Sequence, residues 1–216
     1  PDYHRIDHNY FGNRSRTTAG NFGEMVKIGG EPGTLLSSSY TTVEDNYFYR
    51  ADGEGEIISV KSGKNIIRHN TIDSSSGKIS LRQGSGSIVE DNYIFGNGKM
   101  KTGGISVSGE NHIIRNNYIS NVNPTKHDAW AGISIKNGDP NAKPSYASVK
   151  NVTISSNTII GSGYSFNVGG GNGSVPPENI IFSKNVISST LSPLIFEKTA
   201  IKNPSYTGNI FYGTTL

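Results

Sequence analysis

Cysteine is absent from this sequence of 216 residues, which has only two methionines and one tryptophan. Without cysteine, neither a disulfide framework nor a thiolate metal site can form. No run of 18 apolar residues occurs, so we expect no membrane contact. No secretory leader is visible, and the chain starts at Pro1 within coil sequence, so we expect its true beginning, with any address label, to have been removed. Lysine and arginine never form a run of five or six, which argues against nucleic acid as a partner. The net charge of +3 favours an acidic polymer instead.

An asparagine followed by two aromatic or β-branched residues recurs along the chain. The motif begins at eight positions: Asn9, Asn46, Asn70, Asn92, Asn117, Asn157, Asn185 and Asn209. Successive spacings are 37, 24, 22, 25, 40, 28 and 24 residues. A coil of about 22 to 28 residues is therefore interrupted by two long insertions, as in a solenoid whose loops project from one side. We expect a binding site at those insertions.

The segments around each asparagine are short β-branched runs separated by polar turns, without helical periodicity. They predict an all-β fold, a right-handed parallel β-helix. At a tight bend an asparagine tolerates left-handed backbone angles, and stacked amides of neighbouring coils can hydrogen-bond along the axis. With 27 glycines, a regular repeat and no linker, residues 1–216 are expected to form a single domain.

A second column repeats the pattern apolar, serine, apolar, any residue, at 58–61, 79–82, 105–108 and 133–136. Side chains alternate along a strand, so the apolar residues should enter the core and the other two should face outward. Lys61 and Arg82 are then expected side by side on adjacent strands, about 4.8 Å apart. Lys136 should lie two strands further along.

Two like charges on adjacent strands repel each other and need compensation. Glu54 and Glu56, at alternate positions just upstream of Lys61, can supply it. One extra residue separates the glycine from the cation in this coil, compared with the next one, which predicts a bulge or corner between the glutamates and the lysine. Two interpretations compete: a solvated charge cluster, or an oxygen-ligand site for a cation such as Ca²⁺ beside a lysine base.

These residues resemble polysaccharide lyase family 6, which includes alginate lyases and chondroitinase B. The resemblance is carried by residues 54–62 (EGEIISVKS), Asn70-Thr71 and 81–84 (LRQG), with an upstream segment at 20–29 (GNFGEMVKIG). It extends from about residue 3 to 138 and implies Ca²⁺-assisted β-elimination of a uronate polymer, with alginate favoured. The residues it implies are Asn21, Glu54 and Glu56 as Ca²⁺ ligands, Lys61 as general base and Arg82 as general acid.

Some positions depart from the family pattern. Gln83 stands where a histidine usually follows the arginine, and Ser106 and Trp130 stand where arginines are expected. Loss of guanidinium groups weakens bidentate carboxylate binding. Trp130 either stacks on a sugar or anchors its loop. Expected substrate contacts are Gln83, Lys136, Trp130 and His127.

The resemblance further implies a secreted or periplasmic protein and the C-terminal part of a longer lyase domain. A partner chain or a second copy could then cover the open first coil. Three alternatives remain: a lyase for dermatan or chondroitin-type glycosaminoglycans, a β-helix that binds polyanions without catalysis, and a pectinase-like hydrolase. The hydrolase needs paired carboxylates on the cleft face, whereas Asp45 and Asp91 lie beside the repeated asparagines.

Overall fold

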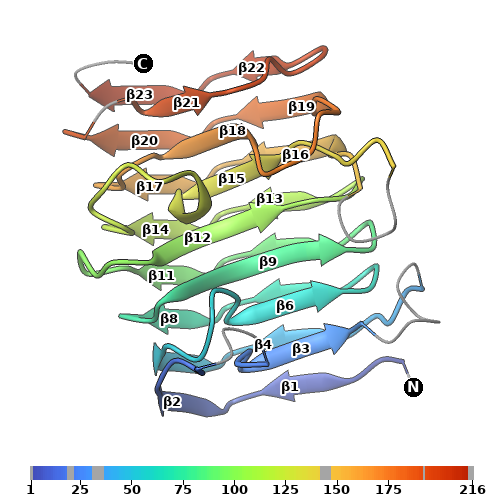
Figure 1. Ribbon diagram of the computed structural model, residues 1–216, viewed down its shortest axis with the longest axis vertical. Helices are drawn as coiled ribbons and strands as arrows, with labels where there is room; N and C mark the ends of the chain where they lie inside the picture. Colours follow the sequence, from blue (N-terminus) through green and yellow to red (C-terminus); the bar gives the residue numbers. More distant parts are fainter. Residues whose placement is uncertain (1, 19–21, 31–36, 142–146, 192, 214–216) are drawn as a thin grey trace.

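The computed structural model describes residues 2–18, 22–30, 37–141, 147–191 and 193–213. Strands of successive coils stack in parallel into three sheets, which form the sides of a β-helix (Figure 1). This confirms the predicted parallel β-helix. Among the described residues, no helix is long and apolar enough to cross a membrane.

Each coil contributes one strand to each sheet in turn. The first sheet contains β1 (Arg5–Asp7), β4 (Thr42–Glu44), β7 (Ile66–Arg68), β10 (Ile88–Glu90), β13 (Ile113–Arg115), β16 (Lys150–Ser155), β19 (Glu178–Ser183) and β22 (Ser205–Thr207). The second contains β2 (Tyr10–Arg14), β5 (Tyr47–Ala51), β8 (Thr71–Asp73), β11 (Tyr93–Phe95), β14 (Tyr118–Ser120), β17 (Thr158–Ile160), β20 (Val186–Ser189) and β23 (Ile210–Gly213). The third contains β3 (Val26–Gly29), β6 (Ile58–Lys61), β9 (Gly77–Gln83), β12 (Thr102–Val107), β15 (Ile133–Lys136), β18 (Phe166–Gly170) and β21 (Ile195–Glu197).

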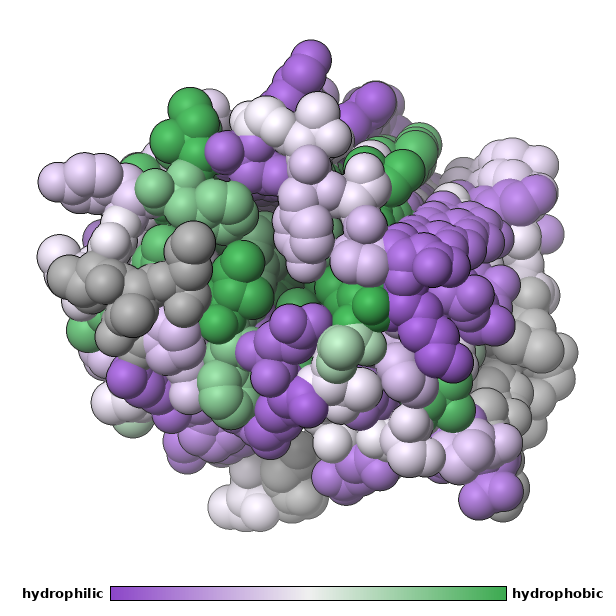
Figure 2. Space-filling view, turned by 90° about the horizontal axis from the view of Figure 1, so that it is seen from above, coloured by the Kyte–Doolittle hydropathy of each residue, from purple (hydrophilic) through white to green (hydrophobic). Residues whose placement is uncertain are grey.

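The core is a continuous column of β-branched and aromatic side chains from the three sheets. In the third sheet Ile58, Ile79, Ile105 and Ile133 lie in register and are buried, as the apolar-serine-apolar pattern predicts. Figure 2 looks along the solenoid axis and shows apolar side chains near the middle of this end, with hydrophilic ones gathered mainly at the right and below. Burial of about 25 cal/mol per Å² of apolar surface stabilises this stacking.

The repeated asparagines form a hydrogen-bonded ladder at the corner between the first and second sheets. Each side-chain amide donates to the amide oxygen of the asparagine in the next coil, at 2.9–3.0 Å through all seven steps. The stacking prediction is thus confirmed. The left-handed angle was assigned to the wrong residue, because it belongs to the residue before each asparagine: His8, Asp45, His69, Asp91, Asn116, Ser156, Lys184 and Gly208.

The long insertions reach the outer face of the third sheet. The first includes the loop before β3. The second carries a short 3₁₀ helix, η1 (Asp128–Trp130), which packs against β12, β15 and β18 at the left of Figure 1. His127 caps this helix, its side chain accepting a hydrogen bond from the backbone N–H of Ala129 at 3.2 Å.

Candidate active site

Three carboxylates converge at one corner of the third sheet. Glu24 comes from the loop before β3, while Glu54 and Glu56 come from the loop between β5 and β6. One carboxylate oxygen of each lies within 4.8 Å of those of the other two. Glu54 is buried, and the other two are half-buried. A loop from the first insertion and a loop of the next coil therefore build one acidic corner.

Two glycines allow these loops to approach each other. A Cβ atom built on Gly53 would lie 2.1 Å from the backbone oxygen of Gly23, and one on Gly23 would lie 2.4 Å from the oxygen of Gly53. The Gly23 N–H donates to the Glu54 carboxylate at 3.3 Å, which ties the loops together. Any larger residue at either position would push Glu24 and Glu54 apart.

Lys61 and Arg82 contact this acidic corner from adjacent strands. Lys61 Nζ lies 3.1 Å from Glu24 Oε1, and an Arg82 guanidinium nitrogen lies 3.4 Å from Glu56 Oε1. Lys61 is 15% exposed and Arg82 32% exposed, so the lysine is the more deeply enclosed of the two. Both cations therefore face the same acidic cluster.

The expected pairing of Lys61 with Arg82 was wrong in detail. The strands stay in register through Val60 and Leu81, and then Lys61 pairs with Gln83. Arg82 becomes the extra residue of a bulge in β9. Glu54 and Glu56 lie at a corner ahead of β6, so the predicted bulge or corner between the glutamates and Lys61 is confirmed as a corner.

Serine hydroxyls of the third sheet hold Glu56 in place. Ser59 and Ser80 donate to its two carboxylate oxygens at 2.5 and 3.1 Å. Both serines lie on the outer side of their strands, as predicted, yet they are buried because the acidic loop covers them. Glu56 thus links β6, β9 and Arg82 in one polar network.

The pKa values reflect crowding of negative charge. Burial raises the pKa of Glu54, and the carboxylates of Glu24 and Glu56 raise it further, against the hydrogen bond from Gly23. For Glu24, burial also favours the neutral form, but its backbone hydrogen bond and the contact with Lys61 outweigh burial and lower the pKa. The corner therefore has an excess of negative charge at Glu54, which a bound cation would relieve.

The sequence as a whole matches the family model for chondroitinase B over residues 1–209. The chain belongs to polysaccharide lyase family 6. No curated protein matches it. Among solved structures, it is similar to the family 6 alginate lyase AlyGC, with 38% identity over 99% of this chain and 31% of that one, and a TM-score of 0.85.

Other solved structures agree with the family assignment. A mannuronic acid-specific family 6 lyase from human gut microbiota is 32% identical over 94% of this chain, with a TM-score of 0.76. A family 6 alginate lyase in complex with a trisaccharide is 28% identical over all of it, with a TM-score of 0.90. This chain spans 43% and 53% of those two proteins, respectively.

The residues of this family 6 member fit a hard divalent cation. Three clustered carboxylates offer up to six oxygens, and oxygen is the ligand that Ca²⁺ prefers. Glu24, Glu54 and Glu56 are the described residues that would hold it. Asn21, which the family resemblance implies as a ligand, lies outside the described residues. Glu24 was not among the residues that the resemblance implied, although it falls inside the upstream segment at 20–29 that carries the resemblance.

The expected substrate contacts occupy different surroundings. Gln83 is buried, and no hydrogen-bond partner of its Oε1 lies in the part of the chain that the structure describes. Trp130 packs its ring over Lys78 Nζ at 4.6 Å and would meet a Cβ on Gly55 at 3.1 Å, which favours the loop-anchor interpretation. His127 is exposed, and Lys136 lies two strands beyond β9, as predicted.

Sequence reasoning also missed Lys78. Its Nζ donates to the carbonyl of Ala129 at 2.9 Å beneath the second insertion. Burial, followed by the charge of Lys136, lowers its pKa to about 8. A signal was present, because Lys78, Ser80 and Arg82 alternate along β9 and therefore share its outer face.

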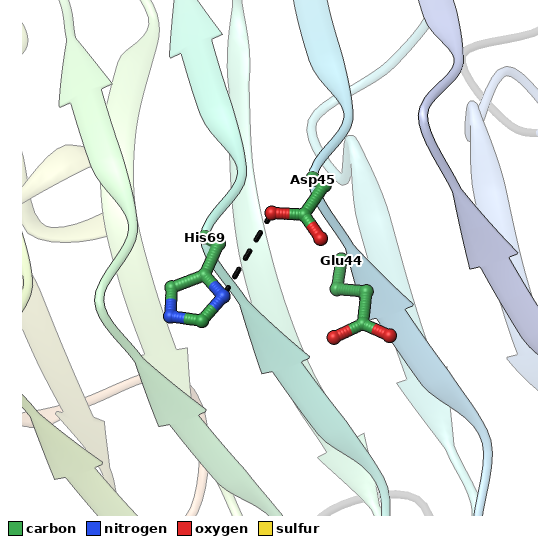
Figure 3. A group of neighbouring side chains, drawn as sticks. All are labelled: Glu44, Asp45 and His69. Carbon is green, nitrogen blue, oxygen red and sulfur yellow. Dashed lines mark ion pairs between the residues drawn. The ribbon is translucent and has the colours of Figure 1, made fainter.

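A second acidic group lies on the first sheet, at Glu44, Asp45 and His69 (Figure 3). His69 Nδ1 is 3.8 Å from Asp45, and its Nε2 is 3.7 Å from Asp91. Glu44 accepts hydrogen bonds from Arg5 and Arg68 at 2.5 and 2.6 Å. Its carboxylate is thus already engaged by two guanidinium groups.

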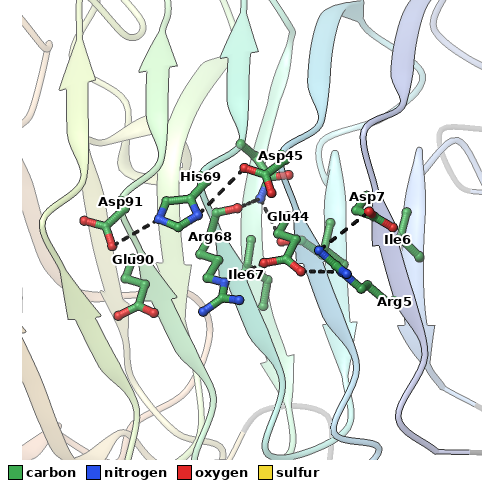
Figure 4. Close-up of polar contacts among 12 residues, drawn as sticks. Arg5, Ile6, Asp7, Glu44, Asp45, Ile67, Arg68, His69, Glu90 and Asp91 are labelled. Carbon is green, nitrogen blue, oxygen red and sulfur yellow. Dashed lines mark hydrogen bonds and ion pairs between the residues drawn. The ribbon is translucent and has the colours of Figure 1, made fainter.

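Charges of opposite sign alternate from strand to strand here (Figure 4). Glu44, Arg68, Glu90 and Arg115 occupy the same register position of β4, β7, β10 and β13. Such cross-strand pairs stabilise a sheet. Asp45 and Asp91 flank a histidine on this outer surface, which gives the pectinase-like alternative no support.

Proposed function

We propose that this chain carries the catalytic centre of a polysaccharide lyase that cleaves alginate by Ca²⁺-assisted β-elimination. The observation that carries the proposal is the meeting of three carboxylates with Lys61 and Arg82 on one face of the third sheet. The family assignment supports the reaction class, and the alginate lyases among similar structures favour alginate. Those proteins are about two to three times as long as this chain, so their activity comes to this protein only as part of the proposal.

The reaction removes a proton from C5 of a uronate and breaks the C4–O bond. Lys61, in its neutral form, accepts the C5 proton, so its contact with Glu24 has to give way to the substrate. The electron pair left on C5 forms the C4–C5 double bond, and the leaving oxygen receives a proton from Arg82 or from water. A cation held at Glu24, Glu54 and Glu56 would neutralise the substrate carboxylate beside C5.

Other residues of the chain orient these groups. Ser59 and Ser80 fix Glu56, and Glu56 in turn holds Arg82. We propose that the unpartnered Oε1 of Gln83, opposite Lys61 in the sheet, accepts a hydrogen bond from a substrate hydroxyl. An amide there can orient a sugar but cannot transfer a proton.

A chondroitin-type glycosaminoglycan is a second candidate substrate, favoured by the family model that the chain matches. Both substrates are polymers found outside cells, which supports the proposed secreted or periplasmic location. The expected partner chain or second copy at the first coil stays a prediction.

The test is incubation with alginate and with chondroitin-type polymers in the presence of Ca²⁺. We expect new ultraviolet-absorbing unsaturated ends from alginate, their loss on adding a chelator, and at least a hundredfold slower release by Arg82→Ala. New reducing ends without unsaturation would indicate a hydrolase. Binding of the polymer without either product would indicate a non-catalytic β-helix.

A further inference from the structure

A cavity of about 290 Å³ opens on the outer face of the third sheet beyond Arg82. Its floor comes from β9, β15 and β18, and its wall from the second insertion around η1. Lining residues include Lys78, Ser134, Lys136, Asn167, Asp128 and Lys198. Lysines outnumber the single carboxylate among the lining residues, and that carboxylate, Asp128, is already paired with Lys198. The charge balance suits an anionic ligand.

A row of polar side chains connects this cavity to the acidic corner. In register, the row follows the third sheet strand by strand through Ser59, Ser80, Ser106, Ser134 and Asn167. Its first two members hold Glu56, and its last two line the cavity. Each of these five residues is at most 3% exposed, so the row lies just below the surface between the two places.

Two atoms of the row are polar and buried and have no hydrogen-bond partner among the described residues. They are Ser106 Oγ and Asn167 Oδ1, on residues that are each 1% exposed. The Asn167 amide nitrogen donates to the Asp128 carbonyl at 2.5 Å, which fixes the orientation of its side chain. Buried polar atoms normally have partners, so a ligand hydroxyl bound here would satisfy them.

Lys78 joins the cavity to the acidic corner. It is 8% exposed, and its ammonium group is held between the Trp130 ring and the Ala129 carbonyl. These partners are neutral, so the charge of Lys78 has no carboxylate in contact among the described residues. The Trp130 ring also packs against Gly55, between Glu54 and Glu56. The same insertion therefore borders both the cavity and the acidic corner.

We propose that this cavity is a second carboxylate-binding subsite, in which Lys78 and Lys136 bind the carboxylate of a uronate beyond the immediate neighbour of the cleaved one. The inference rests on the proposed lyase function and adds a path for the bound polymer, from the acidic corner along the third sheet to the cavity. From β9 to β18 the row crosses three strand spacings, about 14 Å, so only oligomers longer than a dimer reach both places. Ser106, which lies between the acidic corner and the cavity, and Asn167, which lines the cavity, contact sugar hydroxyls of the same oligomer.

The test measures calorimetric affinity for alginate oligomers in a Lys61→Ala background, where turnover does not consume the ligand. Lys78→Met and Lys136→Met keep the apolar stems but remove the charges. Each should weaken binding of a hexamer about tenfold, as expected for loss of a charge-assisted hydrogen bond. Binding of a dimer should change less than twofold. The control is Lys184→Met, an exposed lysine at the opposite corner, which should change neither affinity.

A hexamer whose carboxyl groups are reduced to alcohols should lose the dependence on both lysines. Thermal melting of each variant verifies the fold. Hexamer affinity within twofold of the parent in both folded variants would overturn the subsite while leaving the lyase activity intact. Conversely, affinity that depends on Lys78 and Lys136 in a protein that releases no unsaturated ends would support the subsite and refute the lyase.

Discussion

Substituting Gly53 with alanine should disable the acidic corner while leaving the solenoid folded. The new Cβ would lie 2.1 Å from the Gly23 oxygen, and real Cβ contacts essentially never fall below 3.0 Å, so the two loops must separate by about 0.9 Å. Neither loop can move freely. Gly53 O accepts from Thr17 N at 2.9 Å, and Met25 N donates to Ile57 O at 3.0 Å.

A displacement of about 1 Å can cost on the order of a hundredfold in rate. Weakened support of metal ligands typically costs about 10- to 100-fold in metal affinity. We therefore expect Gly53→Ala to lower Ca²⁺ affinity at least tenfold by calorimetry. Alginate cleavage at fixed Ca²⁺ should fall by about a hundredfold.

The matched control is Gly98→Ala, where an added Cβ meets no atom within 4 Å. Gly98 has a positive φ of 69°, which Gly53 does not, so Gly98→Ala adds backbone strain in another loop without a close contact. It should bind Ca²⁺ as the parent does. If folded Gly53→Ala protein keeps Ca²⁺ affinity within twofold of the parent, the close approach of the two loops is not what builds the cation site.

Three further predictions concern the ladder, the cavity and the first sheet. Asn92→Ala removes five buried hydrogen bonds of 2.9–3.0 Å and should lower the free energy of unfolding, measured with denaturant, by about 3–5 kcal/mol. The control Asn97→Ala, at an exposed position, should lower it by less than about 1 kcal/mol. Equal losses in the two variants would refute a stabilising ladder. Lys78 has a pKa of about 8, so its positive charge is lost as pH rises through that value. Hexamer affinity should fall between pH 7 and 9 in the Lys61→Ala protein but not when Lys78→Met is added, and parallel profiles would argue against Lys78. Hydrogen bonds from Arg68 and Arg5 outweigh burial and lower the pKa of Glu44, so the stability it contributes is present above about pH 4.5 and is lost as pH falls through the lowered pKa. The difference in unfolding free energy between the parent and Glu44→Gln should therefore shrink in acid. A difference that does not depend on pH would contradict this.

Much of the fold could be predicted because each coil of the solenoid repeats the same sequence motif. The fixed offset between each asparagine and its hydrophobic followers defines the coil, and strand alternation assigns Ile58 and Val60 to the core. The left-handed residue was misplaced by one position because asparagine favours this conformation, whereas the residues that adopt it include histidine, serine and lysine, which give no such signal. Only coordinates distinguish which of two adjacent turn residues carries the positive φ.

The candidate site was less accessible to sequence reasoning. Glu54, Glu56 and Lys61 are close in sequence, so their proximity could be predicted from the sequence. Glu24 reaches them from an insertion of the preceding coil, and its position depends on contact between Gly23 and Gly53. The bulge at Arg82 likewise depends on how β9 pairs with β6, and the sequence of β9 alone does not specify that register.

The central claim is that Lys61 removes a proton at an acidic, cation-binding corner. The most direct measurement compares Lys61→Ala with Lys64→Ala at saturating Ca²⁺ and alginate, following the rate at which unsaturated ends appear. Lys64 follows in the next turn and is exposed, with its Nζ near the Tyr40 hydroxyl. We predict at least a hundredfold loss for Lys61→Ala and less than a twofold change for Lys64→Ala. Folded, Ca²⁺-binding Lys61→Ala protein that keeps more than a tenth of the parent rate would contradict the account.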